Sequence, residues 1–176
     1  VEVVWSTGAA VTRFAWWDGE YYDETLSLED GHVRLERMNS GAPLLNSHSS
    51  YDLRSIVGSV VPGSTAIKDG QATARVRLAA TDDCADIVAK VKDGHIRNVS
   101  VGYIVHEYTV REPGDGKRKE MRATDWEPIE VSLVAIPADA GAQLRSRSAG
   151  RGGLTPCVIR GLPGEERTVE MPKDNE

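Results

Sequence analysis

The sequence predicts a β-rich α+β domain with few helices. Short runs of β-branched and aromatic residues, separated by turn residues, fill most of the chain up to Ile136. Two strong hairpin signals, Asp18-Gly19 and Asp69-Gly70, stand between such runs. A chain of 176 residues can bury one good core. We therefore expect a single domain over residues 1–145, followed by a flexible polar tail or linker over residues 146–176.

The predicted strands follow from these runs in chain order. The segment HVRLERM, from His32 to Met38, alternates like a strand but also fits a short helix. The charged stretch EPGDGKRK, which starts at Glu112, is predicted to be a hairpin tip or loop. The expected strands lie near Val3 and at Val11–Trp17, Tyr21–Leu28, Pro43–His48, Ser55–Val61, on both sides of Asp69-Gly70, and at Ile96–Val105 and Ile129–Ile136.

One clear helix is predicted from about Asp82 to Asp93. Its apolar residues fall at i, i+3, i+4 and i+7, which gives a single buried stripe of Cys84, Ile87, Val88 and Val91. Gly94 is placed to end the helix in the left-handed conformation. Cys84 is thus expected in the core rather than at a catalytic site. The segment Ala138–Arg147 is a second helix candidate.

Charge and composition exclude several classes of protein. The formal net charge of −6 disfavours binding to nucleic acid through phosphate contacts. No apolar run is long enough to span a bilayer, and the N-terminus lacks a signal sequence pattern. The two cysteines, Cys84 and Cys157, give neither a disulfide framework nor zinc spacing. We expect a soluble, intracellular protein with no metal, cofactor, membrane or nucleic-acid partner.

The strand IRNVSVGYIV, from Ile96 to Val105, is the centre of the functional hypothesis. Because side chains alternate in a strand, Ser100 and Gly102 share the face opposite Val99 and Val101. Gly102 leaves room beside the hydroxyl for another group to approach. Ser100 is therefore a candidate nucleophile with open space next to it.

Two further residues complete a possible catalytic group. A serine nucleophile needs a base, and His48 ends the apolar stretch PLLNSH just before a polar loop. Glu130 stands in an otherwise apolar strand, where a carboxylate needs a partner. We therefore predict Ser100 as nucleophile, His48 as general base and acid, and Glu130 as orienting carboxylate.

Alternatives to each role stay open at this stage. Other candidate nucleophiles are Cys84, Ser49 and Ser132, and other candidates for the orienting acid are Asp52, Asp125 and Glu127. Oxyanion-hole donors could be N–H groups near Gly102 or after His48, or the side chain of Arg54 or Arg97.

Three blocks of the sequence resemble the prohead serine protease family of tailed phages. These are PLLNSH with its histidine, RNVSVGY with its serine, and EPIEVSLVAIPADAGA with its glutamate, within a similarity from about Val11 to Leu144. The resemblance implies a barrel-like antiparallel sheet, related in fold to the herpesvirus maturation protease, assemblin. It matches Ser100 to the family nucleophile, His48 to the family base and Glu130 to an acidic position in the third block.

The resemblance also implies a biological role. Such an enzyme would lie inside the immature capsid in the host cytoplasm, where it cleaves the scaffolding segment of the major capsid protein. Its expected partners are the major capsid protein, with the portal and further copies of itself as additional candidates. The polar tail from Ser146 would suit self-cleavage, because exposed, disordered segments are favoured sites of proteolysis. The alternative is a non-catalytic β-domain that acts as a capsid or scaffold assembly module.

Overall fold

The computed structural model describes residues 1–17, 19–112, 114, 117–145, 154–160 and 166–172. The chain divides into two compact units, Val1–Ser146 and Arg147–Glu176. The first unit contains a ten-stranded sheet, and the second contains a two-stranded one. The predicted β-rich character with few helices is confirmed.

Short connections join the strands and helices of the first unit. Its helical segments are α1 (Glu36–Asn39), α2 (Ala85–Lys92) and two 3₁₀ turns at Leu53–Ser55 and Asp82–Cys84. Its strands are β1 (Glu2–Ser6), β2 (Val11–Ala15), β3 (Glu20–Leu26), β4 (Pro43–Asn46), β5 (Ile56–Val60), β6 (Ala66–Lys68), β7 (Gln71–Leu78), β8 (Val99–Arg111), β9 (Lys119–Leu133) and β10 (Gln143–Arg145).

The large sheet is open and mixed, so the predicted barrel-like antiparallel sheet is wrong. Its path runs β10-β1-β7-β5-β4-β9-β3-β2, with β6 on β7 and β8 on β9. Strand β9 pairs in parallel with both β3 and β4, while the other pairs are antiparallel. These parallel pairs join strands far apart in the sequence, which local patterns cannot reveal. Near the start of β8, the N–H of Val99 bonds the carbonyl of Ala142 beside β10.

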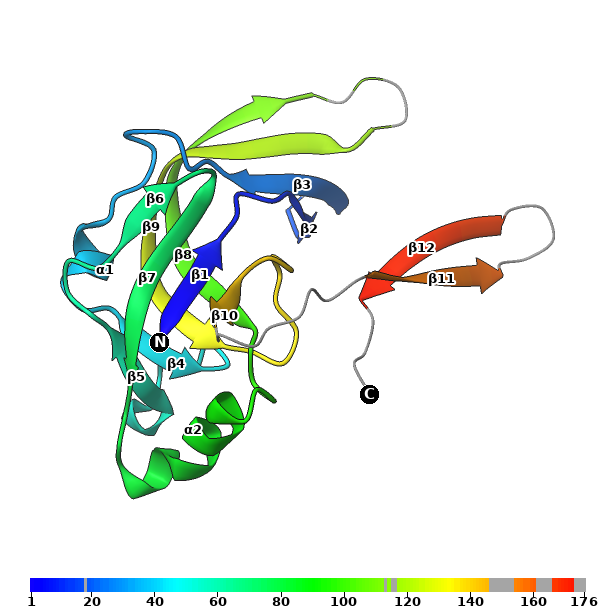
Figure 1. The fold of residues 1–176 in the computed structure, drawn as a ribbon. Helices are drawn as coiled ribbons and strands as arrows, with labels where there is room; N and C mark the ends of the chain where they lie inside the picture. The colour runs from blue at the N-terminus through cyan, green and yellow to red at the C-terminus, as the bar shows by residue number, and fades with distance from the viewer. Residues whose placement is uncertain (18, 113, 115–116, 146–153, 161–165, 173–176) are drawn as a thin grey trace. The chain divides into compact units, whose positions relative to one another are not determined.

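Strands β8 and β9 form a long hairpin that carries the candidate site (Figure 1). The predicted strands Ile96–Val105 and Ile129–Ile136 overlap only the inner part of this hairpin, Val99–Val105 and Ile129–Leu133, whereas pairing continues outward to Arg111 and Glu120. The outer arm of β8 is largely exposed, that of β9 is partly buried, and both are rich in charge, so the apolar alternation of a half-buried strand is weak in their sequence. Their long-range pairing holds them as strands all the same.

The helix predictions have mixed outcomes. A 3₁₀ turn followed by α2 confirms the helix near Asp82–Asp93, and Gly94 takes the left-handed conformation with φ 79°. Cys84 is 2% exposed and belongs to the core, as predicted. Only the end of HVRLERM, from Glu36, forms the short helix α1, while Val33 makes an isolated parallel bridge to Trp126. The helix predicted at Ala138–Arg147 is wrong, because the described part of this segment forms turns and the strand β10.

Aromatic and aliphatic side chains fill the core beneath β8 and β9. Trp126 packs edge-on against Trp5 and Tyr103, with ring centroids 6.0 Å and 5.8 Å apart. Val99 and Val131, which lie on the inward face of the hairpin, are fully buried. Because both strands turn these residues inward, alternation places Ser100 and Glu130 on the opposite face.

The second unit pairs β11 (Leu154–Arg160) with β12 (Glu166–Pro172) in antiparallel register. The division of the chain into a functional domain and a tail with a linker or self-cleavage role stays a prediction. Within the described residues, no helix has both the length and the hydropathy needed to cross a membrane.

Candidate active site

The hairpin register gathers the polar residues of the candidate site. Ser100 lies directly opposite Ser132, and Gly102 lies directly opposite Glu130. Opposite residues in an antiparallel pair project from the same face of the sheet. One small patch of the β8–β9 face therefore contains two serines, one glycine and one carboxylate.

His48 reaches this patch from a tight turn at the end of β4. Strand β4 pairs in parallel with β9, and the N–H of Ser47 bonds the carbonyl of Leu133 at 3.0 Å. Ser47 and His48 then both adopt left-handed backbone conformations, with φ of 54° and 58°. Such conformations cost about 1–3 kcal/mol for residues other than glycine and persist where surrounding contacts hold them. The turn is therefore a fixed element that sets the direction of the His48 side chain.

The imidazole of His48 contacts the carboxylate of Glu130. His48 Nδ1 lies 2.7 Å from Glu130 Oε1. A carboxylate only accepts hydrogen bonds, so Nδ1 carries the proton and Nε2 keeps its lone pair. The His48 side chain is 44% exposed, whereas that of Glu130 is 9% exposed. The pair thus presents Nε2 as a basic nitrogen, because the buried Glu130 carboxylate fixes the orientation of the ring.

Two neighbours define the position of the Glu130 carboxylate. The buried hydroxyl of Ser132 donates to Glu130 Oε2 at 2.6 Å. On the other side, a Cβ atom added to Gly102 would lie only 2.1 Å from Glu130 Oε1. The space that Gly102 leaves beside Ser100 is therefore occupied by this carboxylate.

Ser100 is half-buried at the beginning of β8. Within the described residues, its hydroxyl has no hydrogen-bond partner, and neither does Nε2 of His48. Ser100 also borders a small pocket of about 30 Å³, whose other walls include Trp5, Leu26 and Ala142. The structure thus places Ser100 on the same face as the His48–Glu130 pair and at the edge of an open space.

The wall of this pocket contains a second buried carboxylate, that of Glu24. It accepts hydrogen bonds from the phenols of Tyr103 and Tyr108 and from Arg13 Nε at 3.1 Å. Burial, together with the bonds to Glu24, raises the pKa of both phenols far above the usual value. The two tyrosines therefore stay protonated donors at neutral pH and hold this part of the wall rigid.

The other carboxylates considered for the orienting role contact arginines instead. Asp52 bonds Arg54, Asp125 bonds Arg34, and Glu127 bonds Arg37. In each case the hydrogen bond from the arginine lowers the pKa of the carboxyl. Of the four acidic candidates, Glu130 is the one that contacts His48.

The alternative nucleophiles and oxyanion donors also have defined surroundings. Ser132 is fully buried, Cys84 Sγ lies 3.7 Å from the carbonyl of Ile56, and Ser49 accepts a hydrogen bond from Ser55. Arg54 is engaged by Asp52, and Arg97 Nε donates to the carbonyl of Gly94 at 2.6 Å. N–H groups near Gly102 or after His48 stay the predicted oxyanion donors.

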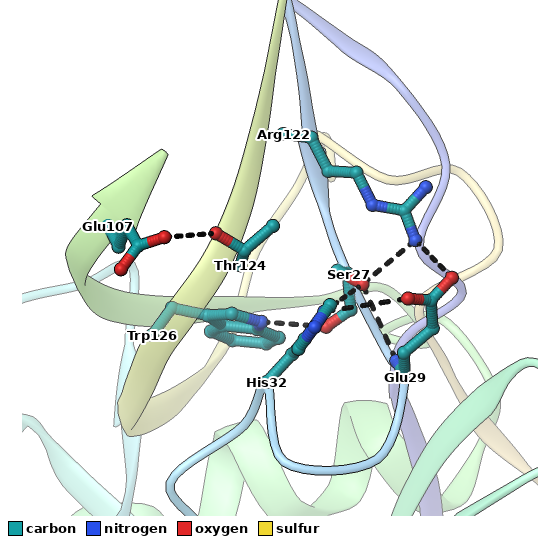
Figure 2. Close-up of polar contacts among 7 residues, drawn as sticks. All are labelled: Ser27, Glu29, His32, Glu107, Arg122, Thr124 and Trp126. Atoms are coloured by element: carbon teal, nitrogen blue, oxygen red, sulfur yellow. Dashed lines mark hydrogen bonds and ion pairs between the residues drawn. The ribbon is translucent and has the colours of Figure 1, made fainter. Parts of the chain in front are cut away.

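A second Ser–His–Glu group lies around Ser27 (Figure 2). We call it the Ser27 cluster, and it consists of Ser27, Glu29, His32 and Arg122. Ser27 Oγ lies 2.7 Å from His32 Nδ1 and accepts from Arg122 Nη2 at 3.0 Å, while Arg122 also bonds Glu29 at 2.7 Å. Local sequence patterns did not predict this cluster, because Arg122 lies far from the other three residues in the chain.

No metal site accompanies these groups in the part of the chain that the structure describes. No set of three or more His, Cys, Asp or Glu side chains is arranged there to hold an ion.

Comparison with known proteins gives two matches. The model of the family described as caudovirus prohead serine protease matches residues 33–151. The chain is also 36% identical over 116 residues to a major capsid protein of Halomonas phage phiHAP-1. That alignment covers 66% of this chain but only 19% of the relative. No solved structure matches the chain.

Proposed function

Because the chain belongs to the caudovirus prohead serine protease family, we propose that it is a serine endopeptidase with Ser100, His48 and Glu130 as its catalytic residues. The main support is the hydrogen bond of 2.7 Å between His48 Nδ1 and Glu130 Oε1, on the face of the sheet that carries Ser100. The family match includes all three residues.

The proposed chemistry follows from these positions. His48 Nε2 removes the proton from Ser100 Oγ as the oxygen attacks the scissile carbonyl carbon, and the carbonyl π electrons move to its oxygen. When the tetrahedral intermediate collapses, the imidazolium gives its proton to the leaving amine. Water then attacks the acyl-enzyme with the same base and restores Ser100. Glu130 stabilises the imidazolium charge in both steps and keeps Nδ1 protonated.

The proposed substrates belong to capsid maturation. The family and the match to a phage major capsid protein support a role in that process. We assign cleavage of the scaffolding segment of the major capsid protein to this chain, and also cleavage of its own polar tail. The reaction would take place inside the immature capsid, with the portal and further copies of the chain as additional partners.

A chemical probe tests the catalytic assignment directly. A fluorophosphonate should modify Ser100 in the native protein, and peptide mapping by mass spectrometry should locate the adduct. His48→Ala should abolish labelling, because the hydroxyl loses its base. Co-expression with the major capsid protein of the same phage should give fragments that the Ser100→Ala variant does not give. Labelling at another serine, or fragments that persist in Ser100→Ala, would refute the assignment.

A second candidate function is a non-catalytic module for capsid assembly. It is favoured by the match to a protein named as a major capsid protein rather than as a protease. This alternative predicts that Ser100→Ala assembles and matures capsids like the native chain. Capsid protein of native, uncleaved length in particles made with the native chain would support it over the protease.

A further inference from the structure

We propose that Ser132 is a positioning residue, which holds both members of the His48–Glu130 pair through one buried hydroxyl. This inference rests on the proposed protease function and concerns the same site. Ser132 is fully buried on β9 and directly opposite Ser100. It acts through its neighbours, since the nucleophilic hydroxyl of the proposal belongs to Ser100.

The hydrogen bonds of Ser132 are directional and complementary. Its Oγ accepts the main-chain N–H of His48 at 3.0 Å and donates its own proton to Glu130 Oε2 at 2.6 Å. A hydroxyl has one proton, so donation to Glu130 leaves its lone pairs for the N–H of His48. One hydroxyl thereby fixes the histidine backbone and the carboxylate relative to each other.

The contact with His48 matters because of the backbone conformation there. His48 has φ of 58°, which is unfavourable for a residue with a side chain, and a bond to its N–H helps to hold it. Without this bond the turn can relax, and the imidazole then moves away from Ser100. The Ser132 hydroxyl is thus a direct support for the orientation of the ring.

Gly102 lies on the other side of the Glu130 carboxylate from Ser132. A Cβ at this position would lie 2.1 Å from Oε1, 2.8 Å from Cδ and 2.9 Å from Cγ of Glu130. The carboxylate cannot move aside easily, because Ser132 and His48 hold its two oxygens. The glycine is required here for space, and its role is to let the carboxylate lie close to β8.

The test compares variants by their rate of Ser100 modification by a fluorophosphonate. Ser132→Ala should label about 10- to 100-fold more slowly, which is the cost expected when a reacting group is misplaced by about 1 Å. Ser132→Thr keeps the hydroxyl and should recover a large part of the rate. The matched control is Ser27→Ala, which removes a hydroxyl that is also 2% exposed or less but lies outside the site. It should label at the native rate.

Proton NMR gives a readout that does not depend on catalysis. The Nδ1 proton of His48, shared with Glu130, should give a downfield resonance in the native protein. Ser132→Ala should shift or broaden it, and Ser27→Ala should leave it in place. Gly102→Ala should displace it too, while Gly114→Ala, whose added Cβ meets open space, should not. This second pair keeps the inference testable if Ser132→Ala does not fold.

The outcomes separate this inference from the proposed function. If native protein labels at Ser100 and both Ser132→Ala and Gly102→Ala match it in rate and resonance, the positioning role is wrong and the protease assignment stands. If native protein never labels at Ser100 but the resonance changes in Ser132→Ala, Ser132 does position the His48–Glu130 pair and the protease assignment fails. A loss of rate in Ser27→Ala equal to that in Ser132→Ala would also refute a specific role for Ser132.

Discussion

The chain contains two groups of serine, histidine and glutamate, and they differ in ways that decide their chemistry. In the Ser27 cluster, the serine, the imidazole and the acid all meet at one ring nitrogen, with Ser27 at 2.7 Å and Glu29 at 3.8 Å from His32 Nδ1. In the candidate site, Glu130 contacts Nδ1 of His48, and Nε2 has no hydrogen-bond partner among the described residues. Only the second arrangement has the geometry of a base held by an acid.

The two serines differ just as clearly. Ser27 is 2% exposed, and its oxygen accepts hydrogen bonds from Arg122 at 3.0 Å and from the N–H of Glu29 at 3.5 Å. These bonds use both lone pairs that a nucleophilic oxygen would need. Ser100 is half-buried beside a pocket and has no such bonds to described residues. Residue types alone therefore do not make a catalytic group. An imidazole nitrogen must be left available as a base, and the serine oxygen must keep a lone pair free for attack.

The largest expected effect separates the two serines. Ser100→Ala should reduce proteolysis and fluorophosphonate labelling by at least about 1000-fold, since the nucleophile is lost. Ser27→Ala should keep both within about twofold, because Ser27 lies outside the proposed machinery. Proteolysis is measured by mass spectrometry of the cleaved cognate capsid protein, and labelling is measured with the fluorophosphonate probe. Equal loss in the two variants would remove the distinction between the clusters.

The two acids give the next largest difference. Glu130→Gln should lower the turnover number by about two to four orders of magnitude, because an amide neither fixes the Nδ1 proton nor stabilises the imidazolium charge. Glu29→Gln serves as the matched control, since the Glu29 side chain is 66% exposed and belongs to the Ser27 cluster, outside the candidate site. Turnover near the native value in Glu130→Gln would return Asp52, Asp125 and Glu127 to consideration.

Local patterns predicted residues that the fold brings onto one face of the sheet, but not the contacts between them. Alternation put Ser100 and Gly102 on one face, and the misfit of Glu130 in an apolar strand indicated a buried partner. The glutamate and Ser132 are two residues apart on one strand, so their shared face was visible in the sequence. Their hydrogen bond, and the carboxylate above Gly102, depend on the β8–β9 register, which pairs residues about thirty positions apart.

The local elements of the fold were predictable from the sequence, but the parallel pairing of its strands was not. Hairpins with Asp-Gly turns and the α2 stripe follow from short-range rules, and both are found. The parallel insertion of β9 between β4 and β3 leaves no local signal, because β9 lies far from both of these strands in the sequence. This insertion brings the His48 turn next to Glu130, so the topology that was missed is also the one that assembles the site.

A smaller effect concerns stability rather than activity. Ser27→Ala leaves Arg122 and His32 without their shared partner, which should reduce the free energy of unfolding by about 1–3 kcal/mol. Ser50→Ala, at an exposed position, should change it by less than about 0.5 kcal/mol. Urea unfolding followed by tryptophan fluorescence measures both. A structural role for the Ser27 cluster would be contradicted if the two variants unfold at the same urea concentration.

The smallest expected effect concerns Glu127, which bonds Arg37 and lies 3.8 Å from His106 but does not contact His48. The hydrogen bond from Arg37 lowers the pKa of Glu127 in the folded chain. A carboxyl with a lowered pKa contributes stability above its unfolded pKa of about 4.3, and that contribution is lost as pH falls through the folded value. Glu127→Gln should therefore make the thermal unfolding temperature less sensitive to acid between about pH 5 and about pH 3. Its proteolytic activity at neutral pH should equal that of the native chain, in contrast to Glu130→Gln. An unchanged acid sensitivity would show that the ion pair with Arg37 does not stabilise the fold, and a large loss of activity would give Glu127 a part in the site.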